Sequence, residues 1–268
     1  MSRPRPSQAA VEQRRQEILR HVAEHGETRI DVLAERFDVS LMTMHRDLDH
    51  LAGRHLLRKV RGRAVAFPAL TMETATRFRE GSNVDVKEAL CAAVAERITP
   101  GATLLMDDSS TLFPLAEMVR GVRNLTVVTN SVGLAQRLGA AKELSVTLLG
   151  GRFHGEFNSC TGPDVVRALG RIHADLALMS ATAVHGGRLF HPLQEYAEVK
   201  EAMLDSAGRA VLLADHSKFG KTATYAYGTA ARYEEVVTDT GTPGAEADAL
   251  RALGVTVTQV TAGEAPRS

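Results

Sequence analysis

The sequence predicts two domains: a small α-rich domain at the N-terminus and a larger C-terminal α/β domain, whose mostly parallel sheet has helices on both faces. Three observations lead to this prediction. The chain has 268 residues, a length that suits two domains. Its first 67 residues show helical apolar spacing and then two short strands around a glycine. Beyond residue 86, strand-length apolar runs alternate with helical stretches.

Composition and charge agree with two domains of different kinds. Charged residues make up 24% and hydrophobic residues 44%, which excludes a disordered, collagen-like or disulfide-scaffold chain. The formal charge is zero, with 32 basic and 32 acidic residues, but residues 1–67 hold 13 basic and 9 acidic side chains. The remainder is correspondingly acidic. A basic small domain joined to an acidic large one indicates a polyanion-binding head on a body with another task.

Cysteine usage and hydropathy predict where the protein works. Only two cysteines occur, Cys91 and Cys160, and they form no paired motif, so we expect free thiols in a reducing cytoplasm. No apolar segment follows the basic start of the chain, and no run reaches the ~18 apolar residues that a membrane span needs. We therefore expect a cytoplasmic protein without a membrane segment.

The N-terminal elements follow from apolar spacing and from capping residues. Residues 11–25 and 30–37 each carry an apolar stripe of helical period. Ser40 is a good N-cap for a third helix, in which apolar residues recur at i, i+4 and i+7. Residues 56–67 read as a basic hairpin around Arg61-Gly62-Arg63. The expected organisation is a winged helix-turn-helix domain over residues 8–67, a linker over residues 68–85 and an α/β effector-sensing domain over residues 86–262.

The exposed side of the third helix and the hairpin carry groups suited to DNA. With Met44, Leu48 and Leu51 inward, Arg46 points outward, and arginine can bond guanine bidentately in the major groove. Cations on the hairpin could neutralise phosphates. The alternative is an ordinary solvated surface, but helix-turn spacing, outward arginine and basic hairpin together favour DNA. The predicted DNA-binding residues are Ser40, Met42, Thr43, His45 and Arg46 on the helix, and Arg58, Lys59, Arg61 and Arg63 on the hairpin.

The C-terminal domain is predicted from the alternation of strands and helices. Such alternation implies βαβ units and a mostly parallel sheet that is covered on both faces. The expected strands are residues 103–106, 125–128, 145–149, 176–179, 210–214, 235–238 and 255–260. The expected helices are residues 86–98, 112–119, 132–138, 163–169, 196–206 and 245–253.

Polar or glycine residues follow the first three of these apolar runs. Ligands of parallel sheets bind at the carboxyl edge of the strands, and hydroxyls with free N–H groups at a helix N-terminus suit a phosphate. Three such segments favour a polyhydroxylated anionic ligand, whereas simple N-capping is the alternative. The predicted effector residues here are Asp107, Ser109, Ser110, Thr111, Thr129, Asn130 and Ser131, with Gly150 and Gly151 permitting close approach of the backbone.

Four further residues complete the predicted effector site. Glu198 and Lys200 lie near the start of a helix, and Asp215 and Lys218 lie on a loop after a strand. Lys218 could pair with a phosphate or carboxylate while Asp215 fixes a hydroxyl; a surface ion pair is the alternative for both. No serine or cysteine nucleophile is suitably spaced from His216, and the His and Cys residues lack zinc spacing. We therefore expect no catalytic residue, no metal and no cofactor.

Motifs in both halves resemble the DeoR family of bacterial transcription regulators. In the first half the matching residues are Leu33-Ala34, Phe37, Val39-Ser40, Thr43-Met44 and Arg46-Asp47-Leu48. In the second half they are Asp107 to Thr111, Val128 to Ser131, Leu149 to Gly151, Ser159 to Pro163, Glu198 to Ala202 and Leu213 to Gly220, which contains the specific stretch ADHSKFG. The chain departs from the family at His45, where a second arginine is usual, at Arg61-Gly62-Arg63, where His-Gly-Gly is usual, and at Ser180 to Val184, where a Gly-rich turn is usual.

The resemblance implies a fold and a function. It implies a head that binds double-stranded operator DNA and a body similar to sugar-phosphate isomerases, such as ribose-5-phosphate isomerase, that senses phosphorylated sugars. We therefore expect a repressor of carbohydrate metabolism genes whose DNA affinity a phosphorylated sugar changes. Two-fold operators mirror dimers or higher assemblies, so a homodimer or homotetramer is expected.

The alternative function is an active sugar-phosphate isomerase that carries a DNA-binding domain. Glu198 with Lys200 or Lys218 would then supply the general base and the electrophile that an enediol mechanism needs. The Asp-Gly-Ala-Asp-Glu and Lys-Gly-Gly-Gly-Gly stretches of those isomerases are not found in this sequence. We therefore expect a regulator and not an enzyme.

Overall fold

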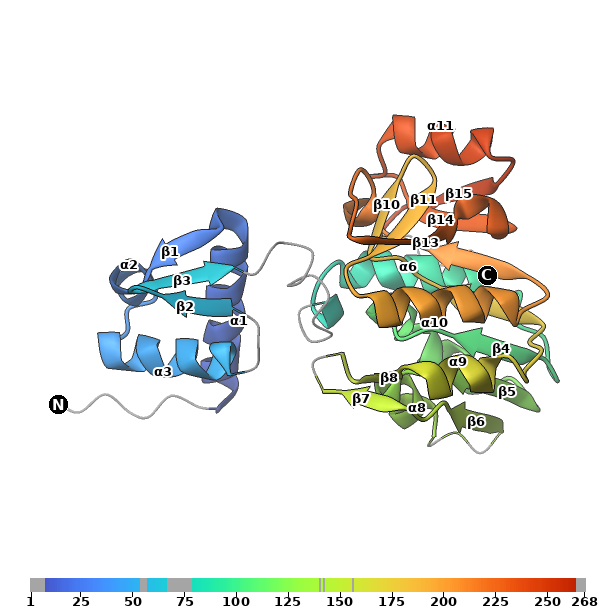
Figure 1. Ribbon diagram of the computed structural model, residues 1–268, viewed down its shortest axis with the longest axis horizontal. Coiled ribbons are helices and arrows are strands. Elements are labelled where there is room, and N and C mark those ends of the chain that lie inside the picture. Colours follow the sequence, from blue (N-terminus) through green and yellow to red (C-terminus); the bar gives the residue numbers. More distant parts are fainter. Residues whose placement is uncertain are drawn as a thin grey trace. The chain divides into compact units, whose positions relative to one another are not determined.

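The computed structural model divides the chain into two compact units, one ending at Phe78 and the other beginning at Arg79 (Figure 1). Each unit has its own apolar core and is described by itself. The structure describes residues 8–53, 57–66, 79–139, 141, 143–155 and 157–263.

The first unit is a winged helix-turn-helix, as the sequence predicts. Its core packs Ile18, Leu33, Met44, Leu48 and Leu57 from three helices and one strand. The chain runs through α1 (Gln8–His25), β1 (Glu27–Arg29), α2 (Ile30–Arg36), α3 (Leu41–Ala52), β2 (Leu57–Val60) and β3 (Arg63–Ala66). The three strands form an antiparallel sheet in the order β1-β3-β2.

The hairpin between β2 and β3 turns on two residues. Arg61 and Gly62 both have positive φ values, 47° and 76°, which a two-residue loop between right-twisted strands requires. Strand β1 was not expected from the sequence. It is three residues long and polar, and it forms because Glu27 pairs with Val65 of the distant β3.

The second unit contains a seven-stranded sheet in the order β15-β14-β12-β9-β4-β5-β6, and all neighbouring strands are parallel. This is the mostly parallel sheet that the sequence predicts. Its strands are β4 (Thr103–Met106), β5 (Leu125–Thr129), β6 (Leu144–Leu148), β9 (Leu176–Met179), β12 (Ala210–Leu213), β14 (Glu235–Asp239) and β15 (Thr256–Val260).

Helices cover both faces of this sheet (Figure 1). Within β4, Leu104 and Met106 belong to one apolar cluster and Leu105 to the other, because successive side chains point to opposite faces. The first cluster contains side chains of α6 (Val84–Ala95), α7 (Leu115–Met118) and α8 (Val132–Leu138). The second contains side chains of α9 (Pro163–Leu169), α10 (Gln194–Asp205) and α11 (Gly244–Ala252).

Short antiparallel strands and 3₁₀ turns between the βαβ units were not expected from the sequence. Each strand has three to five residues and mixes polar with apolar side chains, so neither alternation nor an apolar run marks it. The strands are β7 (Arg152–His154) paired with β8 (Ser159–Thr161), and β10 (Ala183–His185), β11 (Arg188–His191) and β13 (Tyr225–Thr229) in a second small sheet. The 3₁₀ turns are η1 (Ser110–Leu112), η2 (His216–Lys218) and η3 (Ala230–Arg232).

The strand order places a switch point at the centre of the main sheet. From β4 the chain adds β5 and β6 on one side, and then β9, β12, β14 and β15 on the other. The carboxyl ends of β4 and β9 therefore border the crevice where open α/β sheets bind their ligands. Asp107 follows β4 directly, and Ser180 follows β9.

The expected linker falls partly outside the described residues, which exclude 67–78. Residues 79–85 were also expected in the linker, but they belong to the second unit. Helix α6 begins at Val84, and Asn83 donates a hydrogen bond to Asp215 at 2.9 Å, which ties this segment to the end of β12. Within the described part of the chain, no helix is long and apolar enough to cross a membrane.

Candidate functional site

Helix α3 of the first unit begins at a serine cap. Ser40 Oγ accepts a hydrogen bond from the backbone N–H of Thr43 at 3.2 Å and lies 2.9 Å from the Thr43 hydroxyl. Both residues were predicted to contact DNA. In this structure their hydroxyls contact each other at the start of the helix, so they also fix where α3 begins.

The outer face of α3 carries the remaining predicted helix residues. Met42 and Arg46 are exposed and His45 is half-buried, whereas Met44 and Leu48 lie in the core. Arg46 contacts the sulfur of Met42, one turn earlier, at 3.7 Å. A long cation is therefore presented from the N-terminal half of α3, the part of a recognition helix that meets base edges.

Lys59 joins the hairpin to α3. Its Nζ donates to Asp49 at 2.5 Å and lies 3.1 Å from Nδ1 of His45. The sequence did not predict this pairing, which places the lysine beside the helix. Lys59 is only one-quarter exposed, so it links the hairpin to α3 besides carrying charge.

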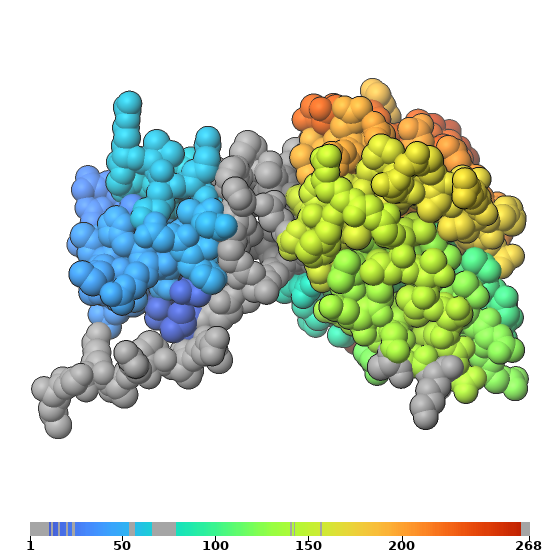
Figure 2. Space-filling model, turned by 60° about the horizontal axis from the view of Figure 1, so that its bottom comes forward, coloured from blue at the N-terminus to red at the C-terminus, as the bar shows by residue number. Residues whose placement is uncertain are grey.

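The other hairpin cations lie at the surface. Arg63 pairs with Glu27 at 2.6 Å, and Arg58 and Arg61 are exposed. Figure 2 shows side chains of the hairpin, in cyan, projecting from the surface of this unit. An exposed ion pair contributes only ~0–1 kcal/mol, so Arg63 can exchange Glu27 for a phosphate at little cost.

A buried carboxylate fixes α3 against α1. Asp47 is 2% exposed and accepts from Arg14 and Arg15, at 2.7 and 2.8 Å. Two cations on one buried carboxylate lock the angle between the helices, because removing either side leaves an uncompensated charge. Asp47 therefore has a structural role, as its position toward the core edge of the helix suggests.

In the second unit, Asp107 and Lys200 form a buried ion pair at the switch point. They are 1% and 3% exposed. Asp107 also accepts from the backbone N–H groups of Ser109 and Ser180, each at 3.0 Å. Lys200 donates to the carbonyl of Ser180 at 2.9 Å. Two predicted site residues, one directly after β4 and one on α10, thus meet at the carboxyl ends of β4 and β9.

The loop after β4 is hydrogen-bonded through its side chains to three other elements. Ser110 Oγ accepts from Lys87 of α6 at 3.2 Å. Thr111 Oγ1 accepts from Ser180 at 3.3 Å. Asp108 accepts from Ser159 of β8 at 3.0 Å. The predicted residues of this loop therefore lie at the centre of a polar cluster, and all of them are buried.

Asp215 and Lys218 lie near the same polar cluster. Asp215 accepts from Asn83 at 2.9 Å and from the backbone N–H of Ser217 at 3.0 Å. Burial opposes ionisation of Asp215, but Lys218, Ser217 and Asn83 together hold its pKa below the usual value. Lys87 lies within electrostatic reach of both Asp215 and Lys218, so both belong to the surroundings of the loop after β4.

The last residue of β5, Thr129, and the two residues after it have partners within the protein. Ser131 caps α8 by accepting from Leu134 at 3.2 Å, and Thr129 accepts from the backbone N–H of Ser131. N-capping, the alternative for these hydroxyls, is thus what Ser131 does. Asn130 donates to the carbonyl of Cys160 at 3.0 Å, while its Oδ1 is buried and has no hydrogen-bond partner in the described part of the chain.

Three more predicted residues lie apart from the polar cluster's centre. A Cβ on Gly151 would stand 2.5 Å from the carbonyl of Thr161, so this glycine permits close packing against β8. Gly150 is exposed and faces open space. Glu198 is exposed and accepts from Gln194 at 2.8 Å, on the side of α10 away from the buried Lys200. The structure therefore does not bring Glu198 and Lys200 together.

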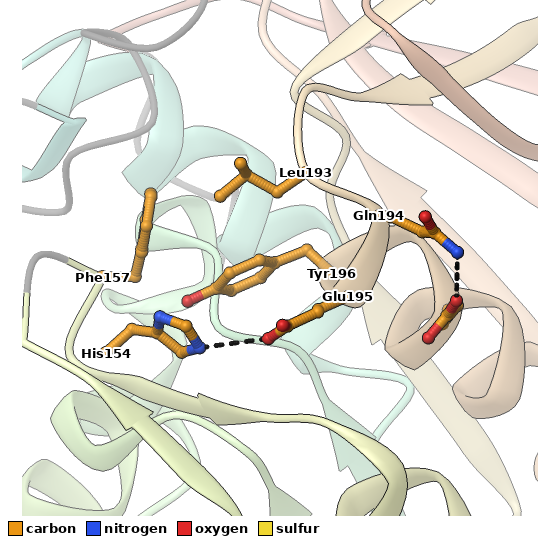
Figure 3. A pocket seen from close by; sticks show the side chains of 7 residues that line it. His154, Phe157, Leu193, Gln194, Glu195 and Tyr196 are labelled. Atoms are coloured by element: carbon orange, nitrogen blue, oxygen red, sulfur yellow. Dashed lines mark hydrogen bonds and ion pairs between the residues drawn. The ribbon is translucent and has the colours of Figure 1, made fainter.

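A pocket of about 570 Å³ opens beside this cluster (Figure 3). Phe157, His154 and Tyr196 face one another in it, with the rings of Phe157 and Tyr196 4.9 Å apart. His154 and Glu195 form an ion-pair contact at 3.3 Å. The lining residues are His154, Phe157, Leu193, Gln194, Glu195, Tyr196 and Glu198.

Tyr196 connects the pocket to the buried cluster. Ser159 gives its single hydroxyl proton to Asp108, so Tyr196 donates to Ser159, at 3.1 Å. The ring of Tyr196 also stacks on His191 at 5.0 Å, and burial together with Lys200 lowers the pKa of His191 to about 3. This neutral imidazole and the tyrosine form the wall between pocket and cluster.

Sequence reasoning missed several residues of the cluster. Lys87, Ser159, Ser180 and Tyr196 make the contacts described above, and none was predicted. Lys87 did carry a signal, because it shares the apolar stripe of α6 with Leu90, Cys91 and Val94. A lysine on an apolar stripe must find buried partners.

The acidic, histidine and cysteine side chains bear on metal and thiol chemistry. Among the described residues, no group of three or more His, Cys, Asp or Glu side chains could hold a metal ion. Cys91 and Cys160 are both buried and free, and burial raises the pKa of Cys91 to about 12. These thiols therefore have the character of inert packing residues.

Comparison with known proteins gives matches for both units. The DeoR-like helix-turn-helix domain matches residues 14–68, and the DeoR C terminal sensor domain matches residues 82–240. The chain is 28% identical over 232 residues to the glycerol-3-phosphate regulon repressor of Escherichia coli (strain K12), covering 86% of this chain and 92% of that protein.

Two further similarities complete the comparison. The chain is 31% identical over 215 residues to the transcriptional repressor AccR of Agrobacterium fabrum, covering 78% of this chain and 82% of that protein. A solved structure of ribose 5 phosphate isomerase A from Neisseria gonorrhoeae is similar with a TM-score of 0.37 and 14% identity, over 50% of this chain and 52% of that one. Since the sensor-domain match alone covers more than half of the sequence, this chain belongs to the DeoR family.

Proposed function

We propose that this protein is a sequence-specific transcriptional repressor whose affinity for operator DNA is changed by a phosphorylated sugar bound to its second unit. The observation that carries the proposal is the buried polar cluster at the switch point of the sheet, on the same chain as a winged helix-turn-helix. Relatives named as a glycerol-3-phosphate regulon repressor and as the transcriptional repressor AccR support it.

The DNA-binding half of the proposal assigns roles by position. Arg46 reads a base in the major groove, because it is exposed on the outer face of α3. Arg58, Arg61 and Arg63 bind phosphates from the hairpin. Lys59 holds the hairpin against α3 through Asp49 and His45 and contributes charge at the same time.

The effector-binding half places the phosphoryl group at Ser109, Ser110 and Thr111. Lys218 supplies positive charge, and Asp215 and Asn130 accept or donate to hydroxyls; Asn130 Oδ1 is a buried acceptor without a hydrogen-bond partner among the described residues. Asp107 serves as a fixed support, since Lys200 and two backbone N–H groups already occupy its oxygens.

The pocket beside Tyr196 suits the sugar portion of the effector. Aromatic faces pack against C–H groups, and Glu195 and Glu198 accept from hydroxyls. Asp108, two residues before Ser110, accepts from Ser159, which in turn accepts from Tyr196 of the pocket wall. This chain of hydrogen bonds links the pocket to the loop that is proposed to bind the phosphoryl group.

The isomerase alternative is less well supported. It needs Glu198 close to Lys200 or Lys218, yet Glu198 is exposed on α10, and Lys200 is buried on Asp107. The relatives reported above are named as repressors. We further propose a homodimer or homotetramer, since two copies of α3 are needed to read a two-fold operator.

The test is calorimetry on the purified protein with a panel of phosphorylated sugars and the corresponding unphosphorylated sugars. We expect at least one phosphorylated sugar to bind and its unphosphorylated counterpart not to bind measurably. Operator fragments selected from random duplexes by the same protein should then be released by that ligand. Equal binding of both kinds of sugar, or turnover of the ligand into an isomer, would contradict the proposal.

A further inference from the structure

Lys87 is a buried cation in the second unit. It lies on α6, is 4% exposed, and shares the inward stripe of that helix with Leu90, Cys91 and Val94. Lysines are almost never this buried unless a partner compensates the charge. The partners of its ammonium group therefore indicate the role of this lysine.

The hydrogen-bond partners of Lys87 are neutral. Its Nζ donates to Ser110 Oγ at 3.2 Å and, over a short contact, to the backbone carbonyl of Arg79. The charged groups around it are Asp215, Lys218, Arg79 and Glu80, two of them positive. Burial is the main cause that lowers the pKa of Lys87, to about 8.

This arrangement suits an anion that arrives from outside the chain. A buried ammonium gains most from a charged partner that also accepts hydrogen bonds, and a phosphoryl group offers three such oxygens. Ser110 Oγ, which Lys87 already contacts, belongs to the loop where the effector's phosphoryl group is proposed to bind. Lys218 adds a second cation to the same surroundings.

The other partner of Lys87 lies at the entrance to the unit. Arg79 is the first residue of the second unit, so the chain that leaves the DNA-binding unit enters the sensor there. The carbonyl of Arg79 also accepts from the backbone N–H of Ser82 at 3.2 Å, and Asn83 is bonded to Asp215. Residues 79–83 are thus held to the sensor by Lys87 and Asp215, and also by Arg137 of α8, which lies 3.7 Å from Glu80.

We propose that Lys87 is the residue through which a bound phosphoryl group acts on the chain that leads to the DNA-binding unit. The proposal rests on the proposed function. When the phosphoryl group binds at Ser110, the ammonium of Lys87 turns from the Arg79 carbonyl to the phosphoryl oxygens, and residues 79–83 lose one of the contacts that hold them to the sensor. Because of this exchange, the phosphoryl group binds more tightly when Lys87 has released the Arg79 carbonyl than when Lys87 still holds it. A ligand can shift an equilibrium between two states only by such a difference in affinity.

The test uses hydrogen exchange and calorimetry on the full chain, with the sugar phosphate that binds the wild-type protein and with inorganic phosphate as a second probe. In the wild type, saturation with the sugar phosphate should speed amide exchange across residues 79–86, where the Ser82 N–H reports on the Arg79 carbonyl. In Lys87→Met, exchange there should already be fast without ligand and should not change with it. The affinity for the sugar phosphate should fall by about 10- to 150-fold, the loss of one charge-assisted hydrogen bond.

Lys221→Met is the matched control, since it removes a half-buried lysine of the same unit that is not among the groups around Lys87. It should leave exchange at residues 79–86 and sugar-phosphate affinity unchanged. Wild-type affinity and wild-type exchange in Lys87→Met would overturn the inference and leave the proposed function standing. If Lys87→Met does not fold, the wild-type protein decides, because unchanged exchange on saturation refutes the inference.

The two probes separate the inference from the proposed function. If no sugar phosphate binds the wild type and inorganic phosphate alone speeds exchange at residues 79–86, free phosphate is the ligand. That result supports Lys87 as its receptor and refutes the proposed function. If neither probe binds the wild type, both proposals are wrong.

Discussion

Replacing Lys200 by methionine should destabilise the second unit strongly, because it leaves Asp107 charged and buried. Asp107 is 1% exposed, and its remaining partners would be two backbone N–H groups at 3.0 Å. Removing one partner of a buried ion pair costs about 3–5 kcal/mol. For a unit of this size each kcal/mol lowers Tm by ~2–4 °C, so Lys200→Met should lower Tm by roughly 6–20 °C.

The physical cause can be isolated with a double variant. Asp107→Asn with Lys200→Met removes both charges, while the asparagine oxygen still accepts from Ser109 or Ser180. The double variant should therefore be more stable than the sum of the single losses predicts, with a coupling energy of about 1–3 kcal/mol. Glu201→Gln, at an exposed position of the same helix, is the control and should change stability by less than about 0.5 kcal/mol.

The assay is thermal and urea unfolding followed by circular dichroism, with the transition of the second unit assigned by a near-ultraviolet probe. A loss below about 1 kcal/mol in Lys200→Met would show that Asp107 does not depend on Lys200 to compensate its charge, since breaking a buried ion pair costs about 3–5 kcal/mol. Strict additivity in the double variant would show that the two residues do not interact.

Three further results are expected. Arg46→Ala should reduce the preference for operator over scrambled duplex by ~1–3 kcal/mol, whereas equal loss of affinity for both duplexes in titrations would refute the groove assignment. Lys218→Ala should weaken sugar-phosphate binding by about 10- to 150-fold in calorimetry and leave DNA affinity without effector unchanged; wild-type binding would remove Lys218 from the site. Sugar-phosphate affinity should fall above pH 8, because Lys87, with a pKa of about 8, then loses the proton that the anion needs; a flat profile from pH 7 to 9 would contradict this.

Lys87 also predicts the sign of a stability change with pH. Its pKa in the folded state lies below the ordinary value of 10.5, so between about pH 8 and 10.5 the unfolded chain binds more protons than the folded one. The contribution of this group to stability therefore rises over that interval. Lys87→Met should lack the rise, whereas Lys221→Met should keep it.

The elements that the sequence predicts well are those whose signal is local. Ser40 caps α3, and Met44 and Leu48 recur at helical spacing, so the helix that carries Arg46 follows from a dozen residues. Strand β4 follows from an apolar run that is buried on both faces. In both cases neighbouring residues determine the structure.

The candidate site is harder to predict because its contacts join residues that are far apart in the chain. Asp107 and Lys200 were both predicted as effector residues, but the sequence did not indicate that they pair with each other, 93 positions apart. No spacing rule connects these two residues, since β9 and α10 must both be in place before they meet. The same holds for Lys59, whose pairing with Asp49 depends on how the hairpin packs against α3.

Hydroxyl residues after strands are ambiguous for another reason. Ser131 and Ser110 both follow strands of the sheet, and both types of position can cap a helix or bind an anion. The structure separates them by their partners, because Ser131 accepts from a backbone N–H of α8, whereas Ser110 accepts from a buried lysine. Sequence alone contains no information on that difference.

On the proposed function, effector binding in one unit and DNA binding in the other are coupled within a single chain. Coupled sites obey reciprocity, so each ligand must change the affinity for the other by the same factor. The most direct measurement is the affinity for the sugar phosphate, by calorimetry, in the absence and presence of saturating operator duplex, beside the operator affinity measured with and without the sugar phosphate. We predict that both ratios are equal and that each lies between about 5- and 150-fold. A sugar phosphate that binds with the same affinity whether or not the operator is present would show that the two units are not coupled.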